Sequence, residues 1–267
     1  MKSIIIRKKR GFTLVELLVV IAIIALLMSI LMPALGRVRT QAKTVLGQSN
    51  LKQWALCFSI YTEDYDGSFN RGWPSVYSDG ALMEWHNSLA PCYGDNLDLA
   101  CCPMATKPVT EGGRMPLAAW GVYPGVWFRK IRYGSYGING YAHNPPPGME
   151  GHDRPADYFW RTPNVKGAEH IPMFLDAQRF DGWPLHDDTP PQFVDDYFGG
   201  IQTDQMRRYT VNRHNGAVNG LFMNFSVRKI PLKCLWKLKW HRKYDINAET
   251  PDWEIEAPWM KKFPECE

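Results

Sequence analysis

A single carboxylate lies in an apolar run that is long enough to cross a membrane. Glu16 is the one charged residue between Phe12 and Met32, and it follows a basic run that ends at Arg10 and Gly11. A carboxylate on a spanning helix costs roughly 2.5 to 3.5 kcal/mol, so Glu16 needs a partner of opposite charge.

The chain itself can supply that partner. A cut between Gly11 and Phe12 leaves a positively charged α-amine on Phe12, four residues and about one helical turn before Glu16. In a packed bundle, the carboxylate of one subunit can neutralise the amine of its neighbour, with both charges shielded from lipid. A cut at this position would therefore give Glu16 the partner of opposite charge that it needs.

These residues resemble the N-terminus of the type IV pilin and type II secretion pseudopilin superfamily. The match consists of Lys-Lys-Arg-Gly, ending at Gly11, followed by Phe-Thr-Leu-Val-Glu, ending at Glu16. The resemblance implies that a prepilin peptidase cuts after Gly11 and methylates the amine of Phe12, and that Glu16 acts in assembly. Pro33 matches a position where many pilins carry a proline that bends the helix. The implied partners are the peptidase and methyltransferase, other pilin-like subunits and an inner-membrane assembly platform.

Two other interpretations of the N-terminal segment are weaker. A cleavable secretory signal has an apolar core of roughly 7 to 15 residues, whereas this run has 21 residues, about 32 Å as a helix. A plain membrane anchor accounts for the length but leaves Glu16 unexplained. The basic leader predicts a single-pass inner-membrane protein with a cytoplasmic N-terminus and a periplasmic globular domain.

The apolar helix is expected to continue as an amphipathic helix beyond Pro33. Val38, Leu51 and Phe58 belong to an apolar pattern at helical spacing, and the turn-forming Asp64 to Gly67 marks the end of a helix of roughly 50 residues. The expected parts are a cleaved leader (1–11), a transmembrane and assembly helix (12–35), its amphipathic continuation (36–66) and an extracytoplasmic globular domain (67–267).

The globular part is predicted to be a small sheet with long irregular loops. Expected strands are 171–177, 216–223 and 225–230, and the last two form a hairpin around Asn224. The predicted fold class is α+β, with a long N-terminal helical spine packed against a small antiparallel sheet, as in pilins.

Several downstream segments resemble the large pseudopilin-like proteins of planctomycetes. In that group a histidine is followed, after nine residues, by Asp-Gly; here the spacing from His214 leads to Asn224-Phe225, so the motif is degenerate. Glycine adopts the positive φ of a tight hairpin without steric cost, whereas the same φ costs conformational energy at Phe225. The other matching segments are Asn50–Gln53, Tyr61–Gly67, Cys102-Pro103, Ser135–Asn139 and Arg213–Gly216.

The charge balance argues against a nucleic-acid partner. The chain carries a net charge of +4, but the leader alone holds five basic residues, so the remaining side chains sum to about −1. No basic face remains to neutralise phosphates.

The cysteines suit disulfides in an oxidising compartment, although buried free thiols remain an alternative. Six cysteines allow fifteen full pairings, and zinc is disfavoured because no Cys-x-x-Cys pair or matching histidine spacing exists. The disulfide candidates are Cys57, Cys92, Cys101, Cys102, Cys234 and Cys266.

A structural Ca²⁺ is an open alternative that rests on oxygen-rich loops and on the calcium-stabilised loops implied by the pseudopilin resemblance. No complete ligand set can be derived from spacing. The candidates are Asp64, Asp66, Asp187, Asp188, Asp195 and Asp196.

Catalysis finds little support in the sequence. No nucleophile elbow, zinc-protease helix, phosphate loop or dinucleotide fingerprint occurs. His214 and Asp176 would be neighbours if their strands pair, and such a couple serves more often as a structural hydrogen bond than as a base. The sequence therefore predicts a non-enzymatic, prepilin-like structural subunit of a pseudopilus or pilus-like fibre. The alternative is a membrane-tethered module that binds a glycan or another exported ligand without polymerising.

Overall fold

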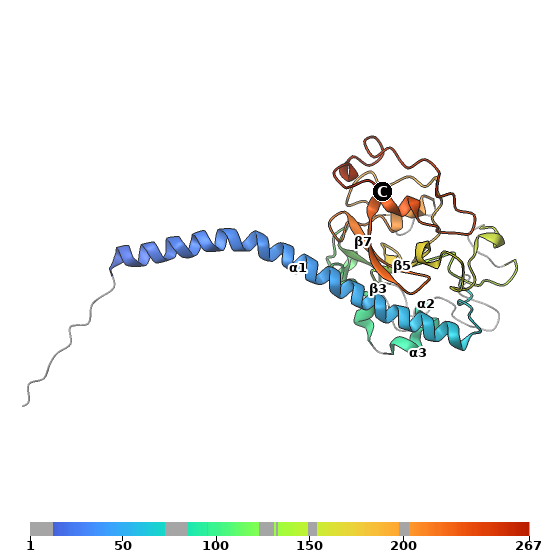
Figure 1. Ribbon diagram of the computed structural model, residues 1–267. Helices are drawn as coiled ribbons and strands as arrows, with labels where there is room; N and C mark the ends of the chain where they lie inside the picture. The colour runs from blue at the N-terminus through green and yellow to red at the C-terminus, as the bar shows by residue number, and fades with distance from the viewer. Residues whose placement is uncertain are drawn as a thin grey trace, which may run out of the picture. The chain divides into compact units, whose positions relative to one another are not determined.

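The computed structural model of the chain divides into two compact units, Met1–Ala42 and Lys43–Glu267. It describes residues 13–72, 85–94, 96–122, 131, 133–148, 154–197 and 203–266. The predicted processing site at Gly11 and Phe12 lies outside these residues. The predicted helix is present as α1, Leu14–Asp64, and part of it belongs to each unit (Figure 1).

Helix α1 ends where the sequence predicts. Gly67, at φ +74°, donates its N–H to the Thr62 carbonyl at 2.7 Å. A left-handed glycine just past a helix satisfies carbonyls that the last turn leaves unpaired. Pro33 lies inside α1, and the helix continues through it.

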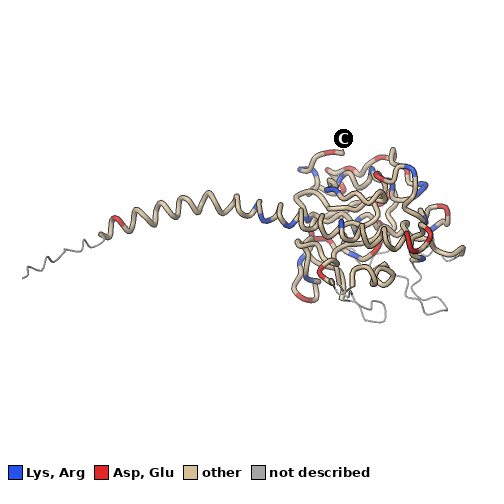
Figure 2. The backbone as a smooth tube through the Cα atoms, turned by 60° about the horizontal axis from the view of Figure 1, so that its bottom comes forward, with Lys and Arg blue, Asp and Glu red and all other residues tan. Residues whose placement is uncertain are grey.

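The part of α1 in the first unit is apolar and exposed. Its most hydrophobic window has a mean hydropathy of 3.0 and none of that window is buried. No charged residue occurs between Glu16 and Arg37, as the continuous tan stretch of the tube in Figure 2 shows. An exposed apolar helix of this length is the expected form of a membrane anchor, and the described residues contain one such helix.

The second unit contains short strands arranged in two mixed sheets within the described residues. One sheet has the order β1-β2-β3 and the other β6-β4-β5-β7-β8. The pairs β4·β5, β5·β7 and β7·β8 are antiparallel as predicted, whereas β1·β2 and β4·β6 are parallel. The strands are β1 (Lys107–Pro108), β2 (Ala118–Gly121), β3 (Tyr133–Gly134), β4 (Tyr136–Asn139), β5 (Pro172–Asp176), β6 (Asp181–Gly182), β7 (Ala217–Phe222) and β8 (Val227–Pro231).

The five-stranded sheet has a hydrophobic core on each face. On one face, Trp54 and Phe58 of α1 pack on Phe174, with ring centroids 5.5 and 5.6 Å apart. The second core joins Leu175 to residues of the C-terminal segments, including Trp240. The sheet is thus the middle layer between the second half of α1 and the C-terminal region. The predicted amphipathic pattern is buried from Gly47 onward, whereas its earlier members Val38, Val45 and Leu46 are exposed.

Short helical elements fill the connections between the strands. They are α2 (Trp85–Ser88), α3 (Ala90–Tyr93), η1 (Leu97–Ala100), η2 (Val109–Glu111), η3 (Ala156–Tyr158), η4 (Ala168–His170), η5 (Gln205–Arg208), η6 (Leu232–Lys237) and η7 (Pro258–Met260).

The β7–β8 hairpin explains how the chain accommodates the degenerate motif. Phe222 N–H donates to the Ser226 carbonyl at 2.9 Å, and Phe225 adopts φ +60° in the turn. A three-residue hairpin loop commonly ends in such a left-handed residue, for which glycine is favoured. Phe225 is nevertheless packed against the core beneath α1, so side-chain burial offsets the backbone cost.

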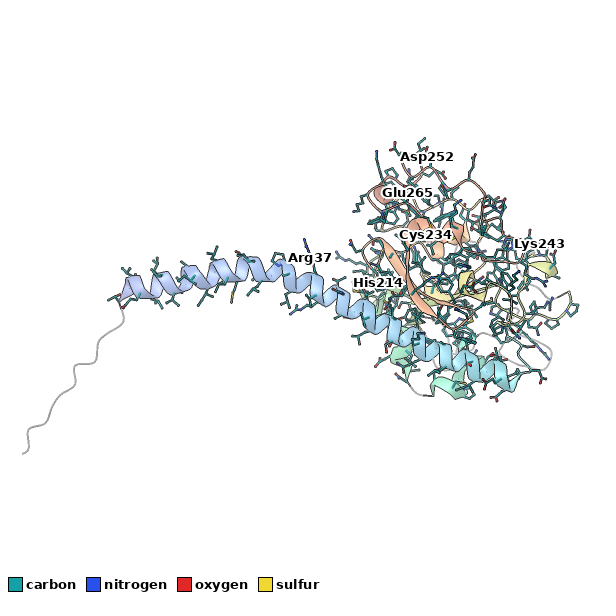
Figure 3. The ribbon with its side chains drawn as sticks, viewed as in Figure 1. Arg37, His214, Cys234, Lys243, Asp252 and Glu265 are labelled. Carbon is teal, nitrogen blue, oxygen red and sulfur yellow. A yellow bond between two sulfur atoms is a disulfide. The ribbon has the colours of Figure 1, made fainter. Side chains whose placement is uncertain are left out.

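One disulfide is present. Cys234 of η6 is bonded to Cys266 near the C-terminus, with their Cα atoms 4.9 Å apart; Figure 3 labels Cys234. The other four cysteines, Cys57, Cys92, Cys101 and Cys102, are free thiols, and all but Cys92 are buried. Cys101 and Cys102 are thus joined neither to each other nor to separate partners.

Candidate functional site

The first candidate site is the start of α1, where Glu16 forms a capping box with Thr13. The Glu16 carboxylate accepts hydrogen bonds from the Thr13 N–H and hydroxyl, each at 2.8 Å, and the Glu16 N–H donates to Thr13 Oγ1 at 3.2 Å. This reciprocal pairing satisfies N–H groups that have no partner inside the helix. The Thr-x-x-Glu spacing is a recognised sequence signal for this capping box, in addition to the signals that predicted the helix.

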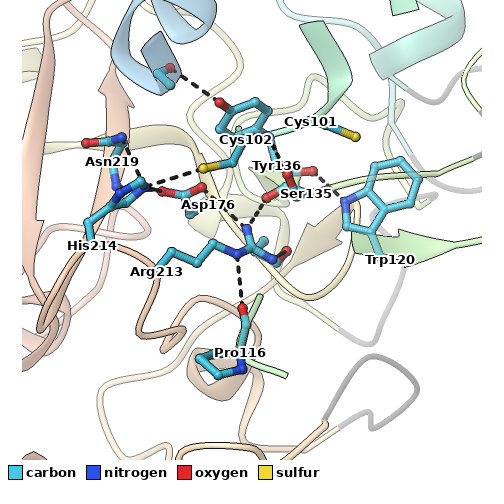
Figure 4. Close-up of polar contacts among 12 residues, drawn as sticks. Cys101, Cys102, Pro116, Trp120, Ser135, Tyr136, Asp176, Arg213, His214 and Asn219 are labelled. Carbon is cyan, nitrogen blue, oxygen red and sulfur yellow. Dashed lines mark hydrogen bonds and ion pairs between the residues drawn. The ribbon is translucent and has the colours of Figure 1, made fainter. Parts of the chain in front are cut away.

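The second candidate site is a buried polar cluster, which we define as Cys102, Ser135, Asp176, Arg213, His214 and Asn219. Each of these residues is at most 1% exposed. Asp176 is the last residue of β5, Asn219 lies in β7, and His214 precedes β7. Because β5 and β7 pair, these residues meet (Figure 4). The predicted neighbourhood of Asp176 and His214 is confirmed, with 3.0 Å between Asp176 Oδ2 and His214 Nε2.

The carboxylate of Asp176 contacts most of the other polar groups of the cluster. Its Oδ2 accepts the Asn219 N–H at 2.7 Å, and Oδ1 lies 3.4 Å from Arg213 Nη1. Burial by itself raises the pKa of a carboxyl, but the hydrogen bond and charge of His214, with the charge of Arg213, hold the pKa of Asp176 below its usual value. Asp176 is therefore an ionised carboxylate in the protein interior.

Arg213 connects the cluster to the surrounding backbone. Its guanidinium donates to the carbonyls of Ala118 and Ala177, both at 2.9 Å, and of Pro116 at 3.3 Å. It also donates to the Ser135 carbonyl. A planar group with five N–H donors can hold several segments at once, so Arg213 joins β2, the residue before β4 and the end of β5 at one point.

The geometry of Cys102 and His214 differs from that of a nucleophile with its base. Cys102 Sγ lies 3.4 Å from His214 Nε2, the same nitrogen that faces Asp176, while Nδ1 faces Thr44 Oγ1 at 2.9 Å. In a catalytic triad the nucleophile and the orienting acid use opposite ring nitrogens. Burial raises the pKa of the Cys102 thiol well above its usual value, and the Asp176 charge adds to the rise. A buried, protonated thiol is a poor nucleophile.

The cluster also attaches the second half of α1 to the sheet. Besides the Thr44–His214 contact, Asn219 Nδ2 donates to the Thr44 carbonyl at 3.1 Å and the Tyr136 hydroxyl donates to the Gly47 carbonyl at 3.3 Å. A Cβ on Gly47 would lie 3.1 Å from Asn219 Nδ2. The glycine at this position therefore permits a close approach of helix and sheet.

Several segments that carry the pseudopilin-like resemblance converge on this cluster. Cys102-Pro103, Ser135–Asn139 and Arg213–Gly216 each contribute one or more of its side chains, and Ser135 Oγ accepts the Cys102 N–H at 2.5 Å. The contact between Cys102 and His214 was not predicted. The presence of both residues in segments that carry the same resemblance was the one sequence signal for it.

The acidic calcium candidates are not gathered into one site. Among the described residues, the one group of three or more side chains with metal-ligand geometry is Cys102, Asp176 and His214. Asp188 Oδ2 accepts the N–H groups of Leu185 and Met206, and Asp196 Oδ2 accepts that of Phe193. The calcium assignment at Asp64, Asp66, Asp187, Asp188, Asp195 and Asp196 stays a prediction.

Asp188 makes a testable contribution to the pH dependence of stability. Burial raises the pKa of Asp188 to about 6, above its unfolded value, so the folded state binds the proton more tightly. The ionised form thus destabilises the fold at pH 7.5, and this destabilisation is lost as the pH falls from about 6 to the ordinary carboxyl value of 3.8. We expect Asp188→Asn to raise the free energy of unfolding by about 1 to 3 kcal/mol at pH 7.5 and by little at pH 3.5.

Denaturant unfolding of the detergent-solubilised full chain between pH 3.5 and 8 measures this difference. The exposed neighbour Asp187→Asn is the matched control and should follow the wild type. An Asp188→Asn stability curve parallel to that of the wild type would contradict the buried-carboxylate explanation.

Comparison with known families identifies the N-terminal segment. Residues 6–32 match the prokaryotic N-terminal methylation motif. With the long apolar helix α1, this match fits a type IV pilin or pseudopilin-like protein. The motif implies processing by a prepilin peptidase and association with a membrane. No curated protein and no solved structure matches the chain.

Proposed function

We propose that this chain is a prepilin-like structural subunit that is cut after Gly11 and assembles into a type II secretion pseudopilus or a type IV pilus-like fibre. The observation that carries the proposal is the methylation motif at residues 6–32, which from Leu14 onward forms the start of α1 with its apolar side chains exposed. Apolar side chains that face lipid in the anchored subunit can face neighbouring helices in a fibre. The basic leader supports a cytoplasmic N-terminus and an extracytoplasmic second unit.

The buried polar cluster supports a non-enzymatic role. Its carboxylate, imidazole and thiol are closed to solvent, and its hydrogen bonds link α1 to the sheet. A substrate would have no access to these groups. We therefore propose that the second unit is a rigid body displayed on the fibre surface, and that its polar core maintains the fold.

Processing is tested by intact mass and N-terminal sequencing of the membrane-extracted protein. We expect a chain that begins at N-methylated Phe12 when the prepilin peptidase is present, and an uncut chain when Gly11 is replaced by Asp, because a bulky charged side chain would then occupy the cleavage position. Ser3→Asp, in the same leader, is the control and should leave cleavage intact. A wild-type chain that keeps Met1 beside an active peptidase would contradict the proposal.

A second candidate function is a membrane-tethered binding module, which one structural observation favours. The second unit has a cleft of about 360 Å³ lined by residues that include Asn50, Leu97, Asp98, Cys101 and Tyr133. Exposed tryptophans are a weaker basis for this function, because Trp85, Trp120 and Trp183 are buried; Trp73 and Trp127 lie outside the described residues. If the chain does not polymerise, replacing Glu16 should leave its membrane insertion and its ligand binding unchanged.

A further inference from the structure

We propose that Cys102, Asp176 and His214 bind a zinc ion inside the second unit. Their donor atoms all lie within 4.8 Å of one another. His214 Nε2 is 3.0 Å from Asp176 Oδ2 and 3.4 Å from Cys102 Sγ. Four-coordinate zinc, with bonds of roughly 2.0 to 2.3 Å, separates its ligand atoms by roughly 3.3 to 3.6 Å. The separations at His214 are close to that range.

Hydrogen bonding alone leaves a conflict at His214 Nε2. This nitrogen lies 3.0 Å from the Asp176 carboxylate and 3.1 Å from the amide nitrogen of Asn219. An imidazole nitrogen holds either one proton or one lone pair. A proton suits Asp176 but opposes the amide N–H of Asn219, and a lone pair suits Asn219 but opposes the carboxylate. A cation that accepts lone pairs from both Nε2 and Oδ2 removes the repulsion between those two atoms.

The groups around these ligands are arranged as an outer shell. With the metal on Nε2, the His214 proton resides on Nδ1 and is donated to Thr44 Oγ1, 2.9 Å away. The Asn219 N–H fixes Asp176 Oδ2 at 2.7 Å. Such partners set the tautomer and orientation of metal ligands. Arg213 lies on the other carboxylate oxygen, Oδ1, and its charge is shared with backbone carbonyls.

Three protein ligands hold the ion, and a water molecule would complete the four-coordinate shell. Asn219 stays outside that shell, because its Nδ2 donates to the Thr44 carbonyl at 3.1 Å and the reversed amide would set Oδ1 against that carbonyl oxygen.

The donor set selects zinc among common cations. Sulfur and imidazole nitrogen suit zinc, whereas calcium and magnesium take oxygen ligands. On binding, the Cys102 thiol releases its proton to solvent, and the resulting thiolate and the Asp176 carboxylate together balance the two positive charges of the ion. Because the ligands are buried, the ion enters as the chain folds. It would join the segment after η1 to β5 and to the residues that precede β7.

The test uses the full chain, purified in detergent without chelators or a histidine tag. We expect about one zinc per chain by mass spectrometry of metal content. After unfolding with a chelator and refolding with Co²⁺, we expect a sulfur-to-cobalt charge-transfer band in the near-ultraviolet. Cys102→Ser should weaken metal binding at least about 100-fold and abolish that band. Cys101→Ser, which changes the adjacent thiol outside the ligand set, is the matched control and should keep both signals.

Two results would overturn the proposal. One is a folded wild-type chain that contains no zinc and shows no cobalt band after refolding. The other is a Cys102→Ser chain that binds the metal as tightly as Cys101→Ser. If Cys102→Ser does not fold, the cobalt spectrum of the wild-type chain still decides the question.

Discussion

Replacing Glu16 by Ala should leave the protein in the membrane but reduce its incorporation into fibres by at least tenfold. The carboxylate is then unavailable to pair with the α-amine of a neighbouring subunit. A tenfold change corresponds to a loss of about 1.4 kcal/mol, well below the roughly 2.5 to 3.5 kcal/mol cost of placing an unpaired carboxylate in a spanning helix. The measurement compares the chain in sheared, sedimented fibres with the chain in the membrane fraction.

Thr13→Ala separates pairing between subunits from capping within one helix. Because Glu16 forms a capping box with Thr13, Glu16→Ala also removes a cap worth about 1 kcal/mol. Thr13→Ala weakens the same capping box but keeps the carboxylate, so it should assemble far better than Glu16→Ala. Glu63→Ala, an exposed carboxylate near the other end of α1, should assemble normally. If Glu16→Ala is incorporated into fibres as well as the wild type, the proposed assembly role of Glu16 is wrong and the binding module is favoured.

Asp176→Ala should lower the free energy of unfolding of the second unit by about 3 to 5 kcal/mol. The substitution leaves Arg213 and His214 buried without their carboxylate and removes the acceptor of the Asn219 N–H. Total stabilities of domains are about 5 to 15 kcal/mol, so a low yield of folded protein is the expected result. Denaturant unfolding of the solubilised full chain measures the difference. The effect is expected with or without a bound metal.

The control for Asp176→Ala is Asp187→Ala, whose carboxylate is exposed and whose removal should change stability by less than about 0.5 kcal/mol. Asp176→Asn should fall between the two, because it keeps a hydrogen-bond acceptor but loses the charge. An Asp176→Ala protein within 1 kcal/mol of the wild type would show that the cluster does not hold the sheet together.

Local sequence patterns predicted the parts of the fold in which a long run of residues shares one signal. The apolar run and the glycine-containing turn at Gly67 gave α1 its length. The apolar run near β5 and the hairpin pattern around Asn224 located β5, β7 and β8 to within a few residues. The parallel pairs β1·β2 and β4·β6 were not predicted, because strands of two to four residues have no measurable periodicity. The burial of α1 also begins later than its apolar pattern suggested.

The buried polar cluster was predicted only in part. Asp176 and His214 were predicted to be neighbours if their strands pair, and β5 and β7 do pair. Cys102 comes from a loop 112 residues away from His214, and Thr44 comes from the helix. No spacing rule relates residues that are brought together by the packing of separate layers. The Cys234–Cys266 bond likewise depends on a Cα separation of 4.9 Å, which only the folded chain defines.

The sequence by itself identified the N-terminal methylation motif, and with it Glu16 and the apolar helix; cleavage after Gly11 stays a prediction. These features act through local order along the chain, and a helix preserves that order in space. Only the tertiary structure decided which thiol lies beside His214, which cysteines are joined and how α1 is tied to the sheet. Those outcomes depend on contacts between residues far apart in the chain, and the packing of α1, the sheet and the C-terminal segments sets them.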